Sequence, residues 1–149
     1  MNKKLIMVIC AAAMTTSWAV ADEKVQVPAD KIPHLDKNQL KSYFPDATVV
    51  EATKEKSKLK NNYEVKLSDG SVIEFDKDGN WTFVECQGNP LPARMIPGQV
   101  HMYMSKNHPG YKVVKMEKDS KRFCTVTLAD GTKVLFDDFM KYVSTEKND

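Results

Sequence analysis

The sequence lacks the side chains and loops from which most catalytic sites are built. It has three histidines among 149 residues, and no serine or cysteine stands in a pattern that places a base beside a nucleophile. A glycine-rich loop of the kind that cradles phosphates is also missing. Carboxylates are plentiful, but they fall on the polar positions of predicted strands, where they are solvated. The sequence therefore predicts a protein that is not an enzyme and that carries no cofactor.

Long apolar runs are absent too, apart from one short run at the N-terminus. Leu5–Met14 follows two lysines and precedes Ala19-Val20-Ala21, which is the order of a cleavable signal peptide with an A-x-A site. The run is too short for a bilayer span, which needs about 20 apolar residues. We expect cleavage after Ala21 and a periplasmic or secreted protein. No later segment is apolar enough to span a membrane.

An excess of charge of either sign is missing once the signal peptide is set aside. The full chain has 22 basic and 20 acidic residues. Two lysines and no acid leave with the signal peptide, so the mature net charge is close to zero. Lysines and acids are interspersed, and the sequence therefore predicts no surface for a nucleic acid.

Cysteine is scarce, and two of the three residues, Cys86 and Cys124, lie beyond the signal peptide. An exported protein meets an oxidising compartment, so a disulfide between them is permitted. Two separately buried thiols are the alternative, because a bridge requires Cα atoms within about 7 Å of each other.

What the sequence does contain is an internal repeat. Val27–Pro33 matches Leu91–Pro97 at an offset of 64 residues, and Val65–Gly70 matches Val126–Gly131 at an offset of 61. The difference of three residues is lost in one turn between the two matches. A gene duplication explains this agreement between apolar and turn positions.

Each copy is predicted to be a helix followed by about four antiparallel strands. Pro33 and Pro97 suit a first helical turn, and Asp69-Gly70 and Asp130-Gly131 are hairpin turns between alternating apolar and polar residues. The last strand is expected at Phe139–Val143. We expect an α+β fold in which the two tandem repeats form one sheet with the helices on one face. The predicted boundaries are residues 1–21 for the signal peptide, 22–88 and 89–143 for the two repeats, and 144–149 for a polar tail.

Four segments carry a family pattern: Tyr63–Gly70, Ile73–Trp81, Leu91-Pro92-Ala93 before the second helix and Asn107–Gly110 at its end. In these the chain resembles the PepSY-like family of exported Bacteroidetes-type proteins, which is related in fold to beta-lactamase inhibitor protein. The resemblance implies a helix-on-sheet module without known chemistry. Beta-lactamase inhibitor protein grips an enzyme with the exposed concave face of its sheet, but no inhibitory residue can be transferred here by motif. Asp137–Met140 departs from the Asp-Gly-Asn turn of the first copy, so this turn motif does not itself predict the last hairpin.

A partner surface is predicted on the sheet face away from the helices. Phe123 and Leu135 are apolar where the strand alternation predicts solvent, and exposed apolar patches often mark interaction surfaces. We expect these two residues and Thr125 to contact an exported or envelope protein or peptide, with Trp81 and Tyr111 flanking them. Inhibition of an exported hydrolase is one version of this function. The alternative is that these side chains pack under loops or against the neighbouring copy.

A small-ligand or copper carrier is the second functional hypothesis. His101, Met104 and His108 share one helical face, and imidazole and thioether groups suit Cu(I). Against it, Met104 aligns with Leu40 and His108 with Phe44 in the first copy. These are predicted core positions, for which methionine is a common filler.

The run Asp76-Lys77-Asp78-Gly79-Asn80 is similar to the start of a calcium loop. Position 12 counted from Asp76 is Gln87, whereas an EF-hand has a bidentate glutamate there. Between two predicted strands the run indicates a turn, in which Gly79 supplies a positive φ.

Overall fold

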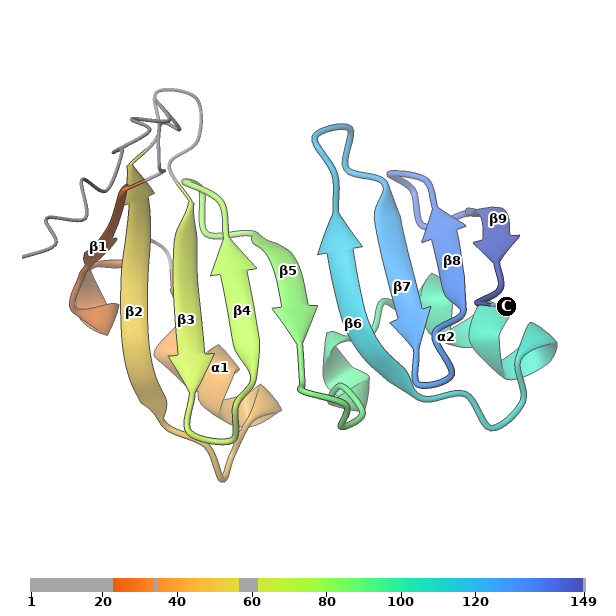
Figure 1. Cartoon of the computed structure of the whole chain (residues 1–149), viewed down its shortest axis with the longest axis horizontal. Helices are drawn as coiled ribbons and strands as arrows, with labels where there is room; N and C mark the ends of the chain where they lie inside the picture. Colours follow the sequence, from red (N-terminus) through yellow and green to blue (C-terminus); the bar gives the residue numbers. More distant parts are fainter. Residues whose placement is uncertain (1–22, 34, 57–61, 149) are drawn as a thin grey trace, which may run out of the picture.

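The structure is a computed structural model that describes residues 23–33, 35–56 and 62–148, so the predicted signal peptide lies outside the described residues. These residues form nine strands and two α-helices (Figure 1). All nine strands belong to one antiparallel sheet in which each strand pairs with its neighbour in sequence. The predicted α+β class with a single sheet is thus confirmed. In the described part, no helix is both long and apolar enough to cross a bilayer.

The two halves repeat the same order of elements. The first half contains β1 (Glu23–Gln26), a short 3-10 turn (Ala29–Lys31), α1 (Lys37–Tyr43), β2 (Val49–Lys56), β3 (Tyr63–Leu67), β4 (Val72–Phe75) and β5 (Trp81–Glu85). The second half contains a 3-10 turn (Ala93–Met95), α2 (Gly98–Asn107), β6 (Val113–Lys118), β7 (Cys124–Leu128), β8 (Lys133–Phe136) and β9 (Tyr142–Glu146). The helices end 64 residues apart, and the last strands begin 61 residues apart. β1 is an additional edge strand on β2 that the sequence did not indicate.

Each helix begins later than its proline predicted. α1 starts at Lys37, because the Asp36 carboxylate accepts hydrogen bonds from the backbone N–H groups of Asn38 and Gln39 at 2.8 and 3.2 Å. Pro33 lies upstream of this cap, so its predicted place in the first helical turn is wrong. Pro97 is the residue directly before α2.

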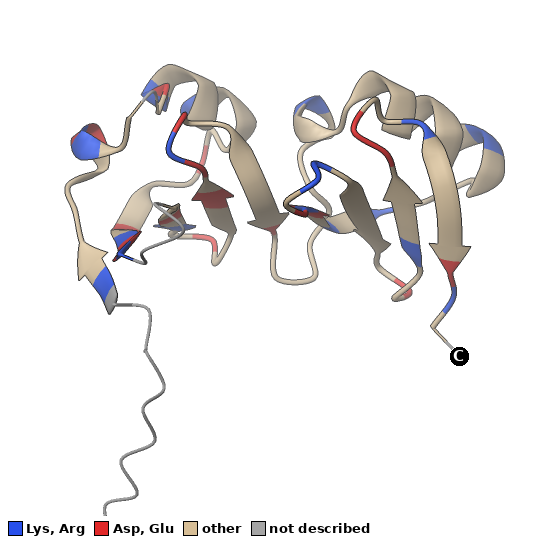
Figure 2. Ribbon diagram, turned by 90° about the horizontal axis from the view of Figure 1, so that it is seen from above, with Lys and Arg blue, Asp and Glu red and all other residues tan. Residues whose placement is uncertain are grey.

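The hydrophobic core lies between the helices and one face of the sheet. Alternate residues of the strands point into it, and Val65, Val84 and Val126 are fully buried. α2 adds Val100 and Met104, which are also fully buried. Burying one such side chain contributes about 1.5–3 kcal/mol. Figure 2 shows both helices on the same side of the sheet.

The last hairpin closes in spite of its departure from the first copy. The Asp137 carboxylate accepts hydrogen bonds from the backbone N–H groups of Phe139 and Lys141 at 2.9 and 2.8 Å. Met140 has a positive φ of 60°, and its counterpart Gly79 in the first half has one of 83°. β9 starts at Tyr142, three residues later than expected, and runs into residues predicted as a polar tail.

The disulfide that the sequence permits between Cys86 and Cys124 is not formed. The backbone N–H of Cys86 donates to the carbonyl of Val114 on β6, whereas Cys124 pairs with Lys118 on the same strand. Four residues of strand separate these positions by about 13 Å, which exceeds the reach of a bridge. Both cysteines are buried free thiols, as the alternative expectation had it.

Candidate functional site

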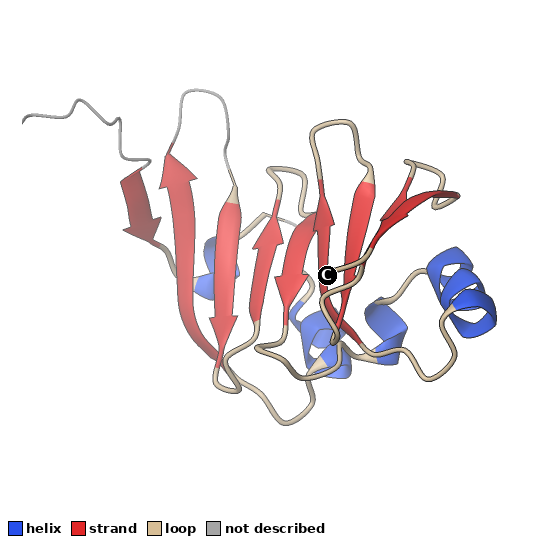
Figure 3. Ribbon diagram, turned by 45° about the vertical axis from the view of Figure 1, so that its right-hand side comes forward, coloured by secondary structure: helices blue, strands red, loops and turns tan. Residues whose placement is uncertain are grey.

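The sheet face opposite the helices, here called the open face, is the candidate site. Residues paired across neighbouring strands form one continuous row of side chains on this face, which crosses all nine strands. Figure 3 shows these strands side by side. This central row consists of Gln26, Thr53, Glu64, Glu74, Phe83, Glu117, Thr125, Leu135 and Ser144. Within the described ranges both helices lie on the other side of the sheet (Figure 2).

The part of the central row from β3 to β6 is acidic. Glu64 and Glu74 stand directly opposite each other on β3 and β4, and Glu117 lies beyond Phe83. The Lys24 ammonium nitrogen is 2.9 Å from a Glu64 oxygen. Half-burial raises the pKa of the Glu74 carboxyl, and the charge of Glu64 adds to this rise. This part of the row therefore favours the approach of positive charge.

Phe83 lies at the centre of the open face, a position that the sequence did not predict. A β-bulge between β4 and β5 leaves Trp81 opposite Phe75 and Phe83 opposite Glu74. The bulge therefore sends Trp81 and Phe83 to opposite faces, although residues two apart on a regular strand share one. The Lys115 ammonium nitrogen lies 5.1 Å from the centre of the Phe83 ring.

From β7 to β9 the central row is neutral. Leu135 stands directly opposite Thr125 on β7, and Phe123 lies two residues before Thr125, on the same face. All three side chains are half-buried. The structure thus brings together the three residues predicted at the centre of the partner surface.

Trp81 and Tyr111 lie elsewhere, so their predicted place beside the partner surface is wrong. Trp81 packs against the core on the helix side, and the Lys118 ammonium nitrogen lies 3.6 Å from the centre of its ring. The Tyr111 hydroxyl shares a hydrogen bond with Nδ1 of His101 on α2. The bulge accounts for Trp81, and the pairing with His101 accounts for Tyr111.

The three predicted copper ligands do not converge. Met104 has an exposed fraction of 0% and belongs to the core cluster, because it faces the sheet. His101 is exposed and is paired with Tyr111. His108 caps the end of α2, where its backbone N–H donates to the Met104 carbonyl at 2.8 Å. The geometry gives the copper hypothesis no support.

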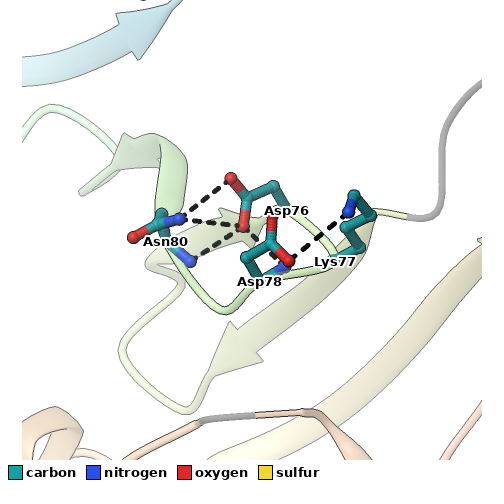
Figure 4. A network of polar contacts seen from close by, with 4 residues as sticks. All are labelled: Asp76, Lys77, Asp78 and Asn80. Atoms are coloured by element: carbon teal, nitrogen blue, oxygen red, sulfur yellow. Dashed lines mark hydrogen bonds and ion pairs between the residues drawn. The ribbon is translucent and has the colours of Figure 1, made fainter.

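The calcium-like run is a turn that uses its own carboxylate. One Asp76 oxygen accepts hydrogen bonds from the backbone N–H groups of Asp78 and Asn80, each at 2.9 Å (Figure 4). Partial burial acts to raise the pKa of Asp76, but these bonds and the Asn80 side chain hold it below its ordinary value. Among the described residues, no three His, Cys, Asp or Glu side chains gather as a metal site.

Comparison with known proteins gives one family and several similar structures. A family model described as "Putative beta-lactamase-inhibitor-like, PepSY-like" matches residues 14–70 and 61–143. A "putative calcium-regulated periplasmic protein" from Bacteroides thetaiotaomicron is 32% identical with a TM-score of 0.77, and the match covers 85% of this chain and 99% of that one.

Two proteins from Bacteroides vulgatus are similar as well. A "putative periplasmic protein from DUF2874 family" is 29% identical with a TM-score of 0.78, over 85% of this chain and 99% of that one. A "putative periplasmic protein of unknown function" is 29% identical with a TM-score of 0.75, over 84% of this chain and 100% of that one. Among curated proteins none matches the chain.

Proposed function

The chain belongs to the PepSY-like family, and from this premise we propose that it is a non-catalytic binding protein that engages a partner protein or peptide through the open face of its sheet. The observation that carries the proposal is the central row, in which Phe83 and Leu135 stand among charged and hydroxyl side chains with no helix of the described chain above them. Aromatic anchors within a polar rim are typical of protein interfaces.

The open face is large enough for this role. Nine strands at about 4.8 Å spacing extend over roughly 38 Å, and five residues of strand add about 17 Å. The resulting area of roughly 650 Å² approaches the ~800 Å² that each partner contributes to a stable interface. A partner that covers most of the face would therefore be held specifically.

The charge of the open face defines the partner's chemistry. Lys24 already pairs with Glu64, so Glu74 opposite it is the carboxylate that a cationic side chain of the partner would contact. Leu135 and Phe123 offer an apolar contact further along the sheet. We infer a partner segment that carries lysine or arginine at one end and an apolar anchor at the other.

The cell envelope is the expected location. The similar Bacteroides proteins are described as periplasmic, and the predicted signal peptide points the same way. The family description contains the words beta-lactamase-inhibitor-like, and in this chain both helices lie on one side of the sheet. An exported hydrolase is therefore one specific partner within the proposal.

Regulation by calcium is not part of the proposal. One similar protein is described as calcium-regulated, but here the Asp76 carboxylate is engaged by its own turn. We expect partner binding to be equal in calcium and in EDTA.

Site-specific photo-crosslinking in the periplasm tests the proposal. A photoreactive phenylalanine analogue at Leu135 on the open face is compared with one at Met102, an exposed residue on the helix side. We expect adducts from position 135 alone, and their loss when Glu74→Lys places a positive charge in the acidic part. Equal adducts from both positions, or none from position 135, would contradict the proposal. Adding the captured protein's substrate then shows whether a hydrolase is inhibited.

A further inference from the structure

A cavity of about 270 Å³ lies on the helix side of the sheet, where the two halves meet. Gln39 and Leu40 of α1 form one wall, and Phe75 and Trp81 of the sheet form another. The second half closes it with Met95 and Lys118. The cavity is separated from the open face by the sheet itself, so it is independent of the proposed partner surface.

The second half shows what fills the equivalent space. Tyr103 is the counterpart of Gln39 at the offset of 64, and Tyr142 is the counterpart of Trp81 at the offset of 61. Tyr103 stacks on Tyr142 with ring centroids 4.5 Å apart and planes inclined by 10°. It also meets the Phe136 ring edge-on at 5.5 Å. An aromatic ring thus occupies the second-half site.

In the first half no ring stands at the position of Tyr103, although the Tyr43 side chain also lines the cavity. Gln39 replaces the tyrosine, and its side-chain amide donates instead to the Tyr43 hydroxyl at 3.1 Å. Trp81 remains in the wall of the cavity. The space that the Tyr103 ring takes in the second half is therefore open in the first, beside an aromatic surface that suits another ring.

Lys118 adds a positive charge to this cavity. Its ammonium nitrogen lies 3.6 Å from the centre of the Trp81 ring, and no carboxylate of the described residues forms an ion pair with it. Lys118 is half-buried, and this burial lowers the pKa of its ammonium group. An anionic group in the cavity would give the ammonium a counter-ion.

We propose that this cavity binds a small aromatic carboxylate, whose ring takes the place that Tyr103 takes in the second half and whose carboxylate pairs with Lys118. The volume lies just below the range of about 300–1,000 Å³ that is typical of ligand pockets. It therefore suits a single ring with a short acidic side chain.

Fluorescence and calorimetric titration of residues 22–149 test this site. Trp81 is the only tryptophan in that range, so its emission reports on the cavity directly. The ligands are phenylacetate, its neutral analogue phenylacetamide and the cationic phenethylamine. We expect phenylacetate to bind with a dissociation constant of about 1 mM or tighter, and the amide at least about tenfold more weakly.

Two variants and one control assign the binding to the cavity. Gln39→Tyr rebuilds the second-half arrangement and should abolish phenylacetate binding while the protein stays folded. Lys118→Met should remove the preference for phenylacetate over phenylacetamide in calorimetry. Lys115→Met, on the same strand but on the open face, should change neither.

Three results would exclude binding of an aromatic carboxylate in the cavity. Absence of saturation by about 20 mM phenylacetate, equal affinity for acid and amide, or unchanged binding by a folded Gln39→Tyr protein would each overturn the proposal. Crosslinking from position 135 is expected in every variant, so failure of this site and failure of the partner surface are distinguishable.

Discussion

Glu74 of β4 lies directly opposite Glu64 of β3, so the two carboxylates are cross-strand neighbours on the open face. Half-burial raises the pKa of Glu74, and the Glu64 charge raises it further. For a carboxyl whose pKa is higher in the folded protein, the free energy of unfolding falls as pH rises from the unfolded value of about 4.3 through the folded value.

Glu74→Gln is therefore expected to raise the free energy of unfolding at pH 7 and to leave it nearly unchanged below about pH 4. Urea denaturation at the two pH values measures the effect. Glu85→Gln, on the same face, is the control for loss of one negative charge. A Glu74→Gln protein that is less stable than the parent at pH 7 would show that the ionised carboxylate is favourably paired.

The stack of Tyr103 on Tyr142 is expected to fasten β9 to α2. Such aromatic pairs contribute about 0.5–1.5 kcal/mol beyond the burial of their area. A double-mutant cycle with Tyr103→Leu and Tyr142→Leu, followed by urea denaturation, should give a coupling energy in that range. The equivalent cycle at Gln39 and Trp81 is the internal control. A coupling energy of equal size there would show that the coupling at Tyr103 and Tyr142 does not come from their aromatic stack.

Arg122 is expected to cost stability, because it holds a φ of 66° in the turn between β6 and β7. The Asp119 carboxylate accepts hydrogen bonds from the N–H groups of Lys121 and Phe123 at 2.8 and 2.9 Å, which fixes the turn. Since glycine adopts this conformation without steric cost, Arg122→Gly should raise the free energy of unfolding by up to about 1 kcal/mol.

The control for this turn is Gly79→Ala in the turn between β4 and β5, where a glycine holds a φ of 83°. It should lower the free energy of unfolding by about 1 kcal/mol. Thermal denaturation of both variants tests the pair. If both variants were more stable than the parent, or both less stable, backbone strain at these positions would not explain the changes in the free energy of unfolding.

The two thiols are expected to stay reduced and unreactive in the folded protein. Burial raises the pKa of Cys124 to about 11 and also raises that of Cys86, so little thiolate is present at neutral pH. Iodoacetamide should label neither cysteine in residues 22–149 under native conditions and both in urea. Rapid native labelling at Cys124 would contradict its burial, and mass spectrometry locates the label.

The repeat made the order of elements predictable from the sequence. Turn signals such as Asp69-Gly70 act locally, and the spacing of apolar residues sets which strand face is buried. The shared face of Phe123, Thr125 and Leu135 was also predictable, because it follows from the alternation of side chains along β7 and β8 and the residue before β7. These features depend on residues close together in the chain.

Features that depend on distant contacts were not predictable in this way. The bulge that separates Trp81 from Phe83 arises from the pairing of β5 with β4, and it breaks the period of two on which the prediction for Trp81 relied. The separation of Cys86 and Cys124 was not predictable either, because it depends on how β5 and β7 are each paired with β6. The cavity, by contrast, left a signal in the sequence, because Gln39 stands where the second copy has Tyr103.

Every strand pairs with the strand next to it along the chain, so the hairpins within each half close over short turns, which favours fast folding. The pairing of β5 with β6 is slower to form, because the segment between Glu85 and Val113 carries α2 and closes a longer loop. A chain that enters the envelope from its N-terminus could complete its first five strands before β6 arrives. The β5 edge would then serve as the template on which the second half assembles, and a delay at that point would leave this edge open to the wrong strand.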